Sequence, residues 1–172
     1  MLRRSLIALA APLLAFGLHA QSGTPAWKTW QIKSCSMNYP TDWAFDNSGI
    51  GGSAVMFSAP ADTAHTYRPH VDLKVIDVKD MGMDAYVESA EKEMRTEFNA
   101  LQLLRSETVR TPREVHTFEF SGQEGGTDIR ARRSVRIAGG KAYVLTYTAT
   151  PDLYDEELYL AEAMFNSFAF PK

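Results

Sequence analysis

Two histidines and an aspartate near the middle of the chain are of the types that bind metal ions. His70 and Asp72 are two residues apart in a segment that alternates like a strand, so their side chains share one face. His65 lies on the loop before that strand. No recognised zinc spacing is present, and a further ligand would have to come from a distant segment. Two hypotheses follow for His65, His70 and Asp72: a metal or small-ligand site, or structural and solvated side chains, which the spacing favours.

A second candidate is a stripe of arginines. Arg130, Arg132 and Arg136 have the same parity, so they share one face of the strand predicted over residues 127–137. An anionic ligand or an acidic partner could bind such a stripe. The alternative, which we favour, is an outer face paired with carboxylates of neighbouring segments.

Arg133 has the opposite parity and accompanies the apolar residues Ala131 and Val135. A charged side chain on an apolar face is costly unless it is paired or lies at an edge. We therefore expect Arg133 at a sheet edge or paired with a buried acid such as Glu119.

The motifs of nucleophilic, zinc-dependent and nucleotide-dependent enzymes are missing from the sequence. It has no Gly-x-Ser-x-Gly, Cys-x-x-Cys, His-Glu-x-x-His or P-loop pattern. Residues 49–54 (GIGGSA) match the glycine pattern of dinucleotide sites, but that chemistry requires a helix next, and the residues that follow predict a strand. We expect a loop there, no cofactor and no catalysis.

The first twenty residues, MLRRSLIALAAPLLAFGLHA, have the layout of a secretory signal. Arg3 and Arg4 supply positive charge, an apolar run follows, and Ala20 is a small residue suited to cleavage. The apolar run is too short for a stable membrane anchor, which is the alternative. We predict cleavage near Ala20 and a periplasmic or secreted protein.

The composition is that of an ordinary globular chain, with 172 residues of which 45% are hydrophobic and 23% charged. Removing residues 1–20 would change the net charge from −3 to −5, because two basic residues and no acidic ones are lost. An acidic protein has no general attraction to phosphates, so no nucleic-acid partner is expected. The one cysteine, Cys35, could be buried, free or linked to another chain, and we expect burial. It lies too far downstream to carry a lipid.

The mature chain predicts a short flexible leader over residues 21–26 and a single domain over residues 27–172. Apolar residues spaced by three and four predict an amphipathic helix over residues 83–101, and Thr150 and Pro151 predict the start of a second helix. Most other segments alternate like strands. They cover residues 27–39, 54–57, 70–78, 115–120, 127–137 and 142–149. Runs of strands with two covering helices predict an α+β fold, an antiparallel sheet flanked by helices.

Two segments and the order of elements resemble the Mog1/PsbP-like superfamily. Residues 39–43 (YPTDW) are similar to its YPxxW entry, and residues 141–147 (KAYVLTY), after a glycine pair, are similar to its meander. The order of apolar strand, long strand, amphipathic helix, meander and final helix is also similar. The resemblance implies an α/β/α sandwich and a non-enzymatic binding or assembly role. Many envelope relatives carry a lipid-bearing cysteine that this sequence lacks.

The leading hypothesis is a secreted, non-catalytic binding or assembly protein of the cell envelope, whose partner is a protein or another envelope component. The alternative is a periplasmic protein that binds a metal or a small ligand, with weak hydrolase activity as one possibility. Arg130, Arg132 and Arg136 are the candidate ligand-binding residues, and His65, His70 and Asp72 are the candidate metal ligands.

Overall fold

The computed structural model describes residues 25–171, so the predicted signal sequence and most of the predicted leader lie outside the described residues. Within that range the chain forms the following helices and strands in order. They are β1 (Trp27–Ile32), β2 (Cys35–Pro40), β3 (Ala44–Asp46), the 3-10 helix η1 (Ile50–Gly52), β4 (Val55–Ser58), β5 (His70–Asp77), α1 (Met83–Glu97), β6 (Asn99–Val109), β7 (Val115–Glu124), β8 (Thr127–Ala138), β9 (Lys141–Ala149) and α2 (Tyr154–Ser167).

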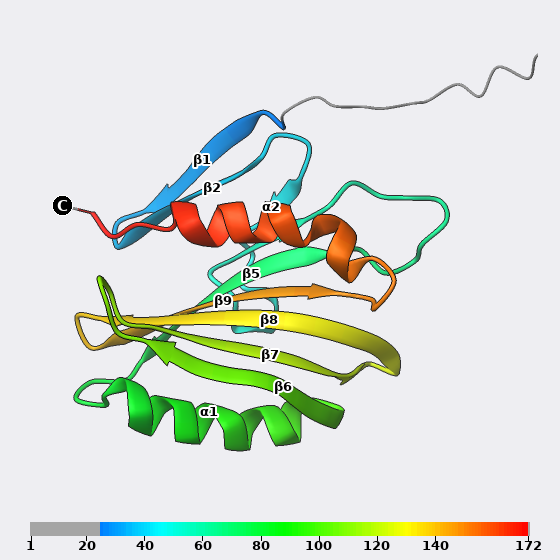
Figure 1. Ribbon diagram of the computed structural model, residues 1–172. Coiled ribbons are helices and arrows are strands. Elements are labelled where there is room, and N and C mark those ends of the chain that lie inside the picture. The colour runs from blue at the N-terminus through cyan, green and yellow to red at the C-terminus, as the bar shows by residue number, and fades with distance from the viewer. Residues whose placement is uncertain (1–24, 172) are drawn as a thin grey trace, which may run out of the picture.

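One sheet organises the molecule. Its seven strands run in the order β3-β4-β5-β9-β8-β7-β6, and each neighbouring pair is antiparallel. Strands β1 and β2 form a separate antiparallel hairpin. Helix α1 covers one face of the sheet, and α2 covers the other face together with the hairpin (Figure 1). The predicted α+β fold, an antiparallel sheet flanked by helices, is confirmed.

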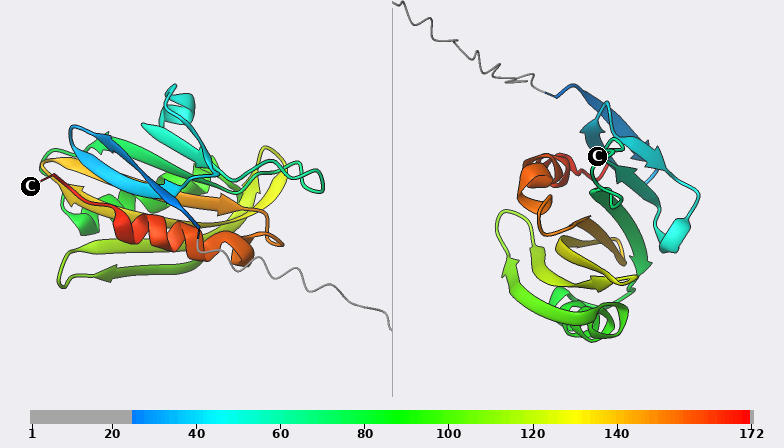
Figure 2. Two further views of the ribbon diagram at one scale, coloured as in Figure 1. Left: turned by 90° about the horizontal axis from the view of Figure 1, so that it is seen from above. Right: turned by 90° about the vertical axis from the view of Figure 1, so that its right-hand side faces the viewer.

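The core on the α2 face is formed where the β1–β2 hairpin and α2 pack against the sheet. The hairpin lies beside α2 (Figure 2), and its residue Trp30 meets Phe57 of β4 edge to face, with ring centroids 6.1 Å apart. Tyr147 of β9 donates a hydrogen bond from its hydroxyl to the backbone oxygen of Tyr154, 3.0 Å away. The hydroxyl of Tyr147 is therefore satisfied, whereas the buried hydroxyl of Tyr154 in the same core has no hydrogen-bond partner among the described residues.

The core on the α1 face is built from the predicted helical stripe. Met83, Tyr86, Ala90 and Met94 are buried and pack over apolar residues of β7, β8 and β9. Their spacing of three and four places them on one side of the helix, as an amphipathic helix on a sheet requires.

Helix α1 ends at Glu97, so the prediction that it extends to Leu101 is wrong. The Phe98 backbone N–H still bonds to the oxygen of Met94, at 3.0 Å, but Phe98 itself is extended. Ala100 then has a φ of 51° at the start of β6. The apolar stripe continues past the helix because Phe98 remains buried against the same sheet.

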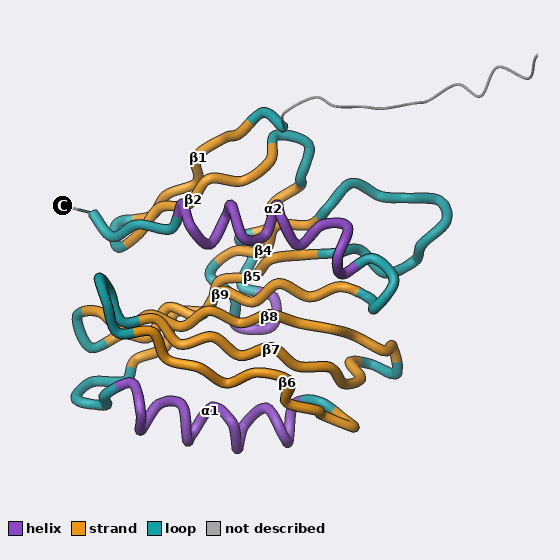
Figure 3. Tube along the Cα trace, viewed as in Figure 1, coloured by secondary structure: helices purple, strands orange, loops and turns teal. Residues whose placement is uncertain are grey.

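Several other boundaries differ from the predictions, and residues 27–39 form the two strands of the β1–β2 hairpin (Figure 3). Helix α2 begins at Tyr154 because residues 151–153 form a turn, closed by the Leu153 N–H bonding to the oxygen of Thr150 at 3.1 Å. Strand β7 extends to Glu124, and the turn lies at Gly125 and Gly126. The φ values of these glycines, 57° and 86°, are in the left-handed region that favours glycine.

Cys35 is 1% exposed, which confirms the expected burial. Burial also raises the pKa of its thiol, because the thiolate loses hydration. None of the helices within residues 25–171 is both long and apolar enough to cross a membrane.

Candidate functional site

A row of polar residues crosses the centre of the sheet on the α1 face. Asp72 on β5 pairs with Thr146 on β9, which pairs with Arg133 on β8. Directly paired residues of antiparallel strands point to the same side, so the three side chains are neighbours. The adjacent row on this face contains Val144 and Val135, which are buried and apolar. The polar row therefore replaces core residues where the cover of α1 ends.

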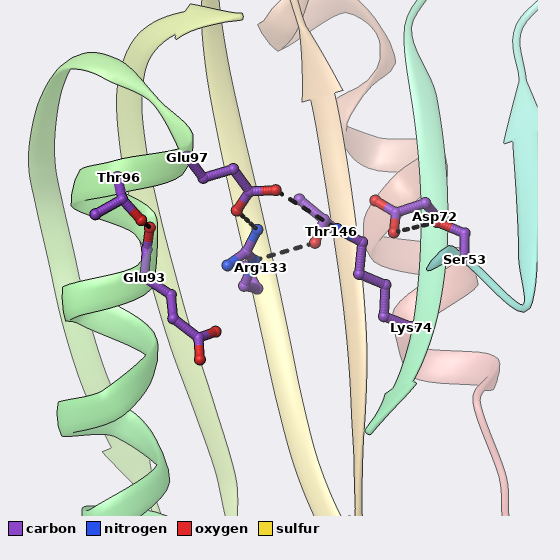
Figure 4. A network of polar contacts seen from close by, with 8 residues as sticks. All are labelled: Ser53, Asp72, Lys74, Glu93, Thr96, Glu97, Arg133 and Thr146. Atoms are coloured by element: carbon purple, nitrogen blue, oxygen red, sulfur yellow. Dashed lines mark hydrogen bonds and ion pairs between the residues drawn. The ribbon is translucent and has the colours of Figure 1, made fainter. Parts of the chain in front are cut away.

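The side chains of this row take part in two separate sets of polar contacts (Figure 4). Ser53 Oγ donates a hydrogen bond to Asp72 Oδ2 at 3.1 Å, and Arg133 Nε donates one to Thr146 Oγ1 at 3.2 Å. Glu97, at the end of α1, accepts from both cations: its oxygens lie 3.4 Å from Arg133 Nη2 and 3.5 Å from Lys74 Nζ. Each arm of the network comes from a different segment of the chain.

These residues line a hollow of about 180 Å³, which we call the Asp72 recess. The sheet forms its floor, and η1 and the end of α1 form its walls. Polar residues that are only 4–8% exposed contribute to its lining. They are Ser53, Asp72, Arg133, Thr146 and Thr148. Buried polar groups in this number are costly unless they are paired, so the recess is a specialised part of the core.

Asp72 is the titratable group at the centre of the recess. Burial raises the pKa of its carboxyl, and the positive charges of Lys74 and Arg133 oppose that rise. His70, two residues earlier, lines the same recess, as the shared strand face predicted. The recess thus holds a desolvated carboxylate, two cations turned toward Glu97, and threonine hydroxyls. This arrangement can bind a small polar group.

Arg130, Arg132 and Arg136 lie on the opposite face, under α2. Arg130 makes an ion pair with Glu119 and Arg132 makes one with Glu162. Arg136 donates to the backbone oxygens of Phe165 and Phe168, at 2.9 and 2.8 Å. The stripe therefore fastens α2 to the sheet, and its use by an anionic ligand stays a prediction.

The partner expected for Arg133 is wrong in detail. Glu119 has the parity of the α2 face and pairs with Arg130, so it cannot reach Arg133 across the sheet. The acid that does pair with Arg133 is Glu97, which comes from α1. The counter-charge for Arg133 comes from a helix that lies over the strand. The alternation of residues along a strand does not predict which helix residue lies above it.

His65 lies apart from His70 and Asp72. It lines a second, larger hollow of about 570 Å³ beside α2, where its Nδ1 is 2.7 Å from Asp62 and its Nε2 is 3.6 Å from Asp152. The structure thus brings two of the three metal candidates together and separates the third. Nowhere in residues 25–171 do three histidine, cysteine, aspartate or glutamate side chains form a group that could hold a metal ion.

One cluster contains an acid, a hydroxyl and an imidazole. Ser106 Oγ donates to Glu91 Oε1 at 2.9 Å and lies 3.3 Å from His116 Nε2, whose ring Nδ1 is 2.7 Å from Thr108 Oγ1. In a catalytic triad the acid orients the histidine, whereas here it binds the serine directly. Since His116 is also only 2% exposed beneath α1, the cluster serves packing.

Sequence reasoning missed most members of the Asp72 recess. Thr146 and Thr148 belong to a segment that is largely apolar on both parities, so it predicts a buried strand and no site. Glu97 belonged to the polar face of the predicted helix. The available signal was that two threonines alternate with tyrosine and leucine in a strand otherwise filled by large apolar residues.

Known proteins resemble this chain in fold and not in sequence. No family model and no curated protein matches the sequence. Among solved structures, cyanobacterial PsbP (CyanoP) from Synechocystis sp. PCC 6803 is similar, with a TM-score of 0.66 and 16% identity, over 91% of this chain and 99% of that one. LpqN of Mycobacterium tuberculosis, described as involved in cell envelope biogenesis, has a TM-score of 0.58 and 13% identity, over 90% of this chain and 88% of that one.

The chain has the PsbP-like fold. The resemblance predicted from residues 39–43 and the order of elements is therefore confirmed at the level of fold. Identities of this size establish the fold and leave function to the site.

Proposed function

We propose that this chain is an exported, non-catalytic binding or assembly protein of the cell envelope. The signal-like pattern of residues 1–20 supports export, with cleavage near Ala20 and release to the periplasm or the outside. The fold shared with LpqN, a protein described as involved in cell envelope biogenesis, supports the location. The partner is a protein or another envelope component, and the negative charge argues against nucleic acid.

The Asp72 recess is the observation that carries the binding role. Its side chains are held by the sheet and by one another, which is the preorganisation that a binding site needs. The recess contains hydroxyls, a carboxylate and cations. Among the contacts of its described residues, none joins a hydroxyl to a base and that base to an acid, which is the arrangement that activates a nucleophile. Such a site is suited to holding a group rather than transforming it.

In-cell photo-crosslinking tests this proposal. A photoreactive residue at Met56, which lines the recess, is compared with the same residue at Glu88, which is exposed on α1. We expect a saturable crosslinked species in the envelope fraction from Met56 alone. Equal crosslinking from both positions, or the mature protein in the cytoplasm, would contradict the proposed function.

A further inference from the structure

The Asp72 carboxylate is only partly satisfied by the protein. Its Oδ2 accepts a hydrogen bond from Ser53, and no described residue donates one to Oδ1. The two nearby cations, Lys74 and Arg133, make their ion pairs with Glu97 instead. A carboxylate that is 8% exposed and lacks an ion-pair partner is costly to bury, because it loses hydration without a full replacement.

The charges around the recess leave an excess of acid. Asp72, Glu97 and Glu124 line it against Lys74 and Arg133, so the acidic groups outnumber the lysine and arginine by one. Glu97 forms ion pairs with both cations, and the one described donor to Asp72 is the neutral hydroxyl of Ser53. The group that would complete Asp72 is therefore a positively charged hydrogen-bond donor.

The rest of the lining describes what such a donor would be attached to. Thr148 is 4% exposed and offers a hydroxyl on the floor beside the row of Asp72. Apolar surface comes from Met56, which pairs with Asp72 on the floor, and from Ile50 and Phe98 on the walls. The volume of about 180 Å³ equals roughly six water molecules at about 30 Å³ each. A ligand of this size with a polar end and a short apolar chain fits the lining.

We propose that the Asp72 recess binds a small organic cation, a primary ammonium group on a short apolar chain. The ammonium donates to Oδ1 of Asp72 and to the hydroxyl of Thr148, and the chain lies against Met56 and Phe98. Ile50, which is 63% exposed at the rim, loses water when the chain enters. This inference rests on the proposed binding function and specifies its ligand class.

Three probes with the same chain and different head groups test the proposal. Butylammonium, butanol and butyrate are titrated separately into the isotopically labelled mature protein, and amide shifts are followed by NMR. We expect butylammonium to shift amides of β5 and β9 around Asp72 and Thr148, with butanol at least about tenfold weaker, as the loss of a charge-assisted hydrogen bond predicts. Butyrate is expected not to bind.

Variants assign the effect to the recess. Asp72→Asn is expected to weaken butylammonium binding at least about tenfold and Thr148→Val about threefold, since the first removes an ion pair and the second a hydrogen bond to an uncharged hydroxyl. The matched control is Asp62→Asn, because Asp62 is an exposed acid of the other hollow. Amide spectra of each variant establish that the fold is retained.

Two results would overturn the inference: equal affinity of butanol and butylammonium, or butylammonium binding that Asp72→Asn leaves unchanged. Either result is distinct from a failure of the proposed function. If crosslinking from Met56 still captures an envelope component while butylammonium does not bind, the binding function stands and the assignment of ligand class fails.

Discussion

Ser53 Oγ lies 3.1 Å from Asp72 Oδ2 and ties the segment between η1 and β4 to the floor of the sheet. A serine hydroxyl is a neutral donor, so it offsets only part of the cost of an ionised buried carboxylate. At neutral pH Asp72 therefore reduces the stability of the protein in which it is buried. A buried carboxylate that destabilises the fold is expected where the function of a site requires it.

Asp72→Asn is expected to raise the free energy of unfolding at pH 7, because the amide is neutral and can still accept from Ser53. Burial raises the pKa of Asp72 in the folded protein above its usual value of 3.8. The protonated carboxyl therefore contributes fully to stability below the usual value, and this contribution is lost as pH rises through the folded pKa. Urea unfolding across this range measures both effects. Asp80→Asn, at an exposed position, is the control. A less stable Asp72→Asn protein at pH 7 would contradict this account.

His116 and His65 are expected to titrate on opposite sides of the usual histidine pKa of 6.5. Burial lowers the pKa of His116, whereas the hydrogen bond with Asp62 raises that of His65. Histidine ring shifts followed by NMR against pH measure the two values directly. A pKa of His116 above that of His65 would show that the imidazole beneath α1 is hydrated.

The lowered pKa of His116 also predicts a pH dependence of stability. The contribution is full above the unfolded pKa of about 6.5 and is lost as pH falls from there toward the folded pKa, since the unfolded chain binds the proton more readily. His116→Asn, which cannot be protonated, is expected to remove this part of the slope. His65→Asn is the matched control, and it should leave the decline below pH 6.5 in place.

Arg136 is expected to be the most important of the three arginines for stability. Its guanidinium donates to the backbone oxygens of Phe165 and Phe168 at the end of α2, where the Phe165 oxygen also accepts from the Phe168 N–H. Arg136→Gln should lower the free energy of unfolding by about 1.5–3 kcal/mol, the range for hydrogen bonds that involve a charged group. Thermal or urea unfolding measures it. Lys92→Gln, which removes an exposed i,i+4 pair with Glu88, should cost less than about 0.5 kcal/mol.

The fold was predictable where one rule governed a segment. The alternation of Val71, Leu73 and Val75 identified β5 because one face of the strand is core. The glycine pair at 139–140 indicated the hairpin between β8 and β9. The boundary of α1 was not predictable, because Phe98 packs against the same sheet whether it is helical or extended. Periodicity reports the direction of a side chain, and it does not report where the backbone changes conformation.

The site was less accessible to sequence than the fold. Asp72 and Arg133 each stood out, as an acid in an alternating strand and as a cation on an apolar face. Their meeting depends on the pairing of β5, β9 and β8, which brings together residues 72, 146 and 133. Strands β8 and β9 are consecutive in the chain, but β5 and β9 are distant, and no local pattern encodes the register between them. Only the three-dimensional sheet makes the recess visible.

Cys35 is expected to be unreactive in the native protein. Its side chain lies in the core between the hairpin and α2, and burial raises the pKa of the thiol, so both access and the reactive thiolate are suppressed. A disulfide to a second chain would require β2 to leave this core. We expect a chromogenic disulfide reagent to label the thiol only as the protein unfolds in urea, with a midpoint equal to that of the loss of tertiary structure. A Cys35→Ser protein provides the blank. Rapid labelling without denaturant, or a dimer on a non-reducing gel of the exported protein, would show that the hairpin opens and that this cysteine belongs to an interface.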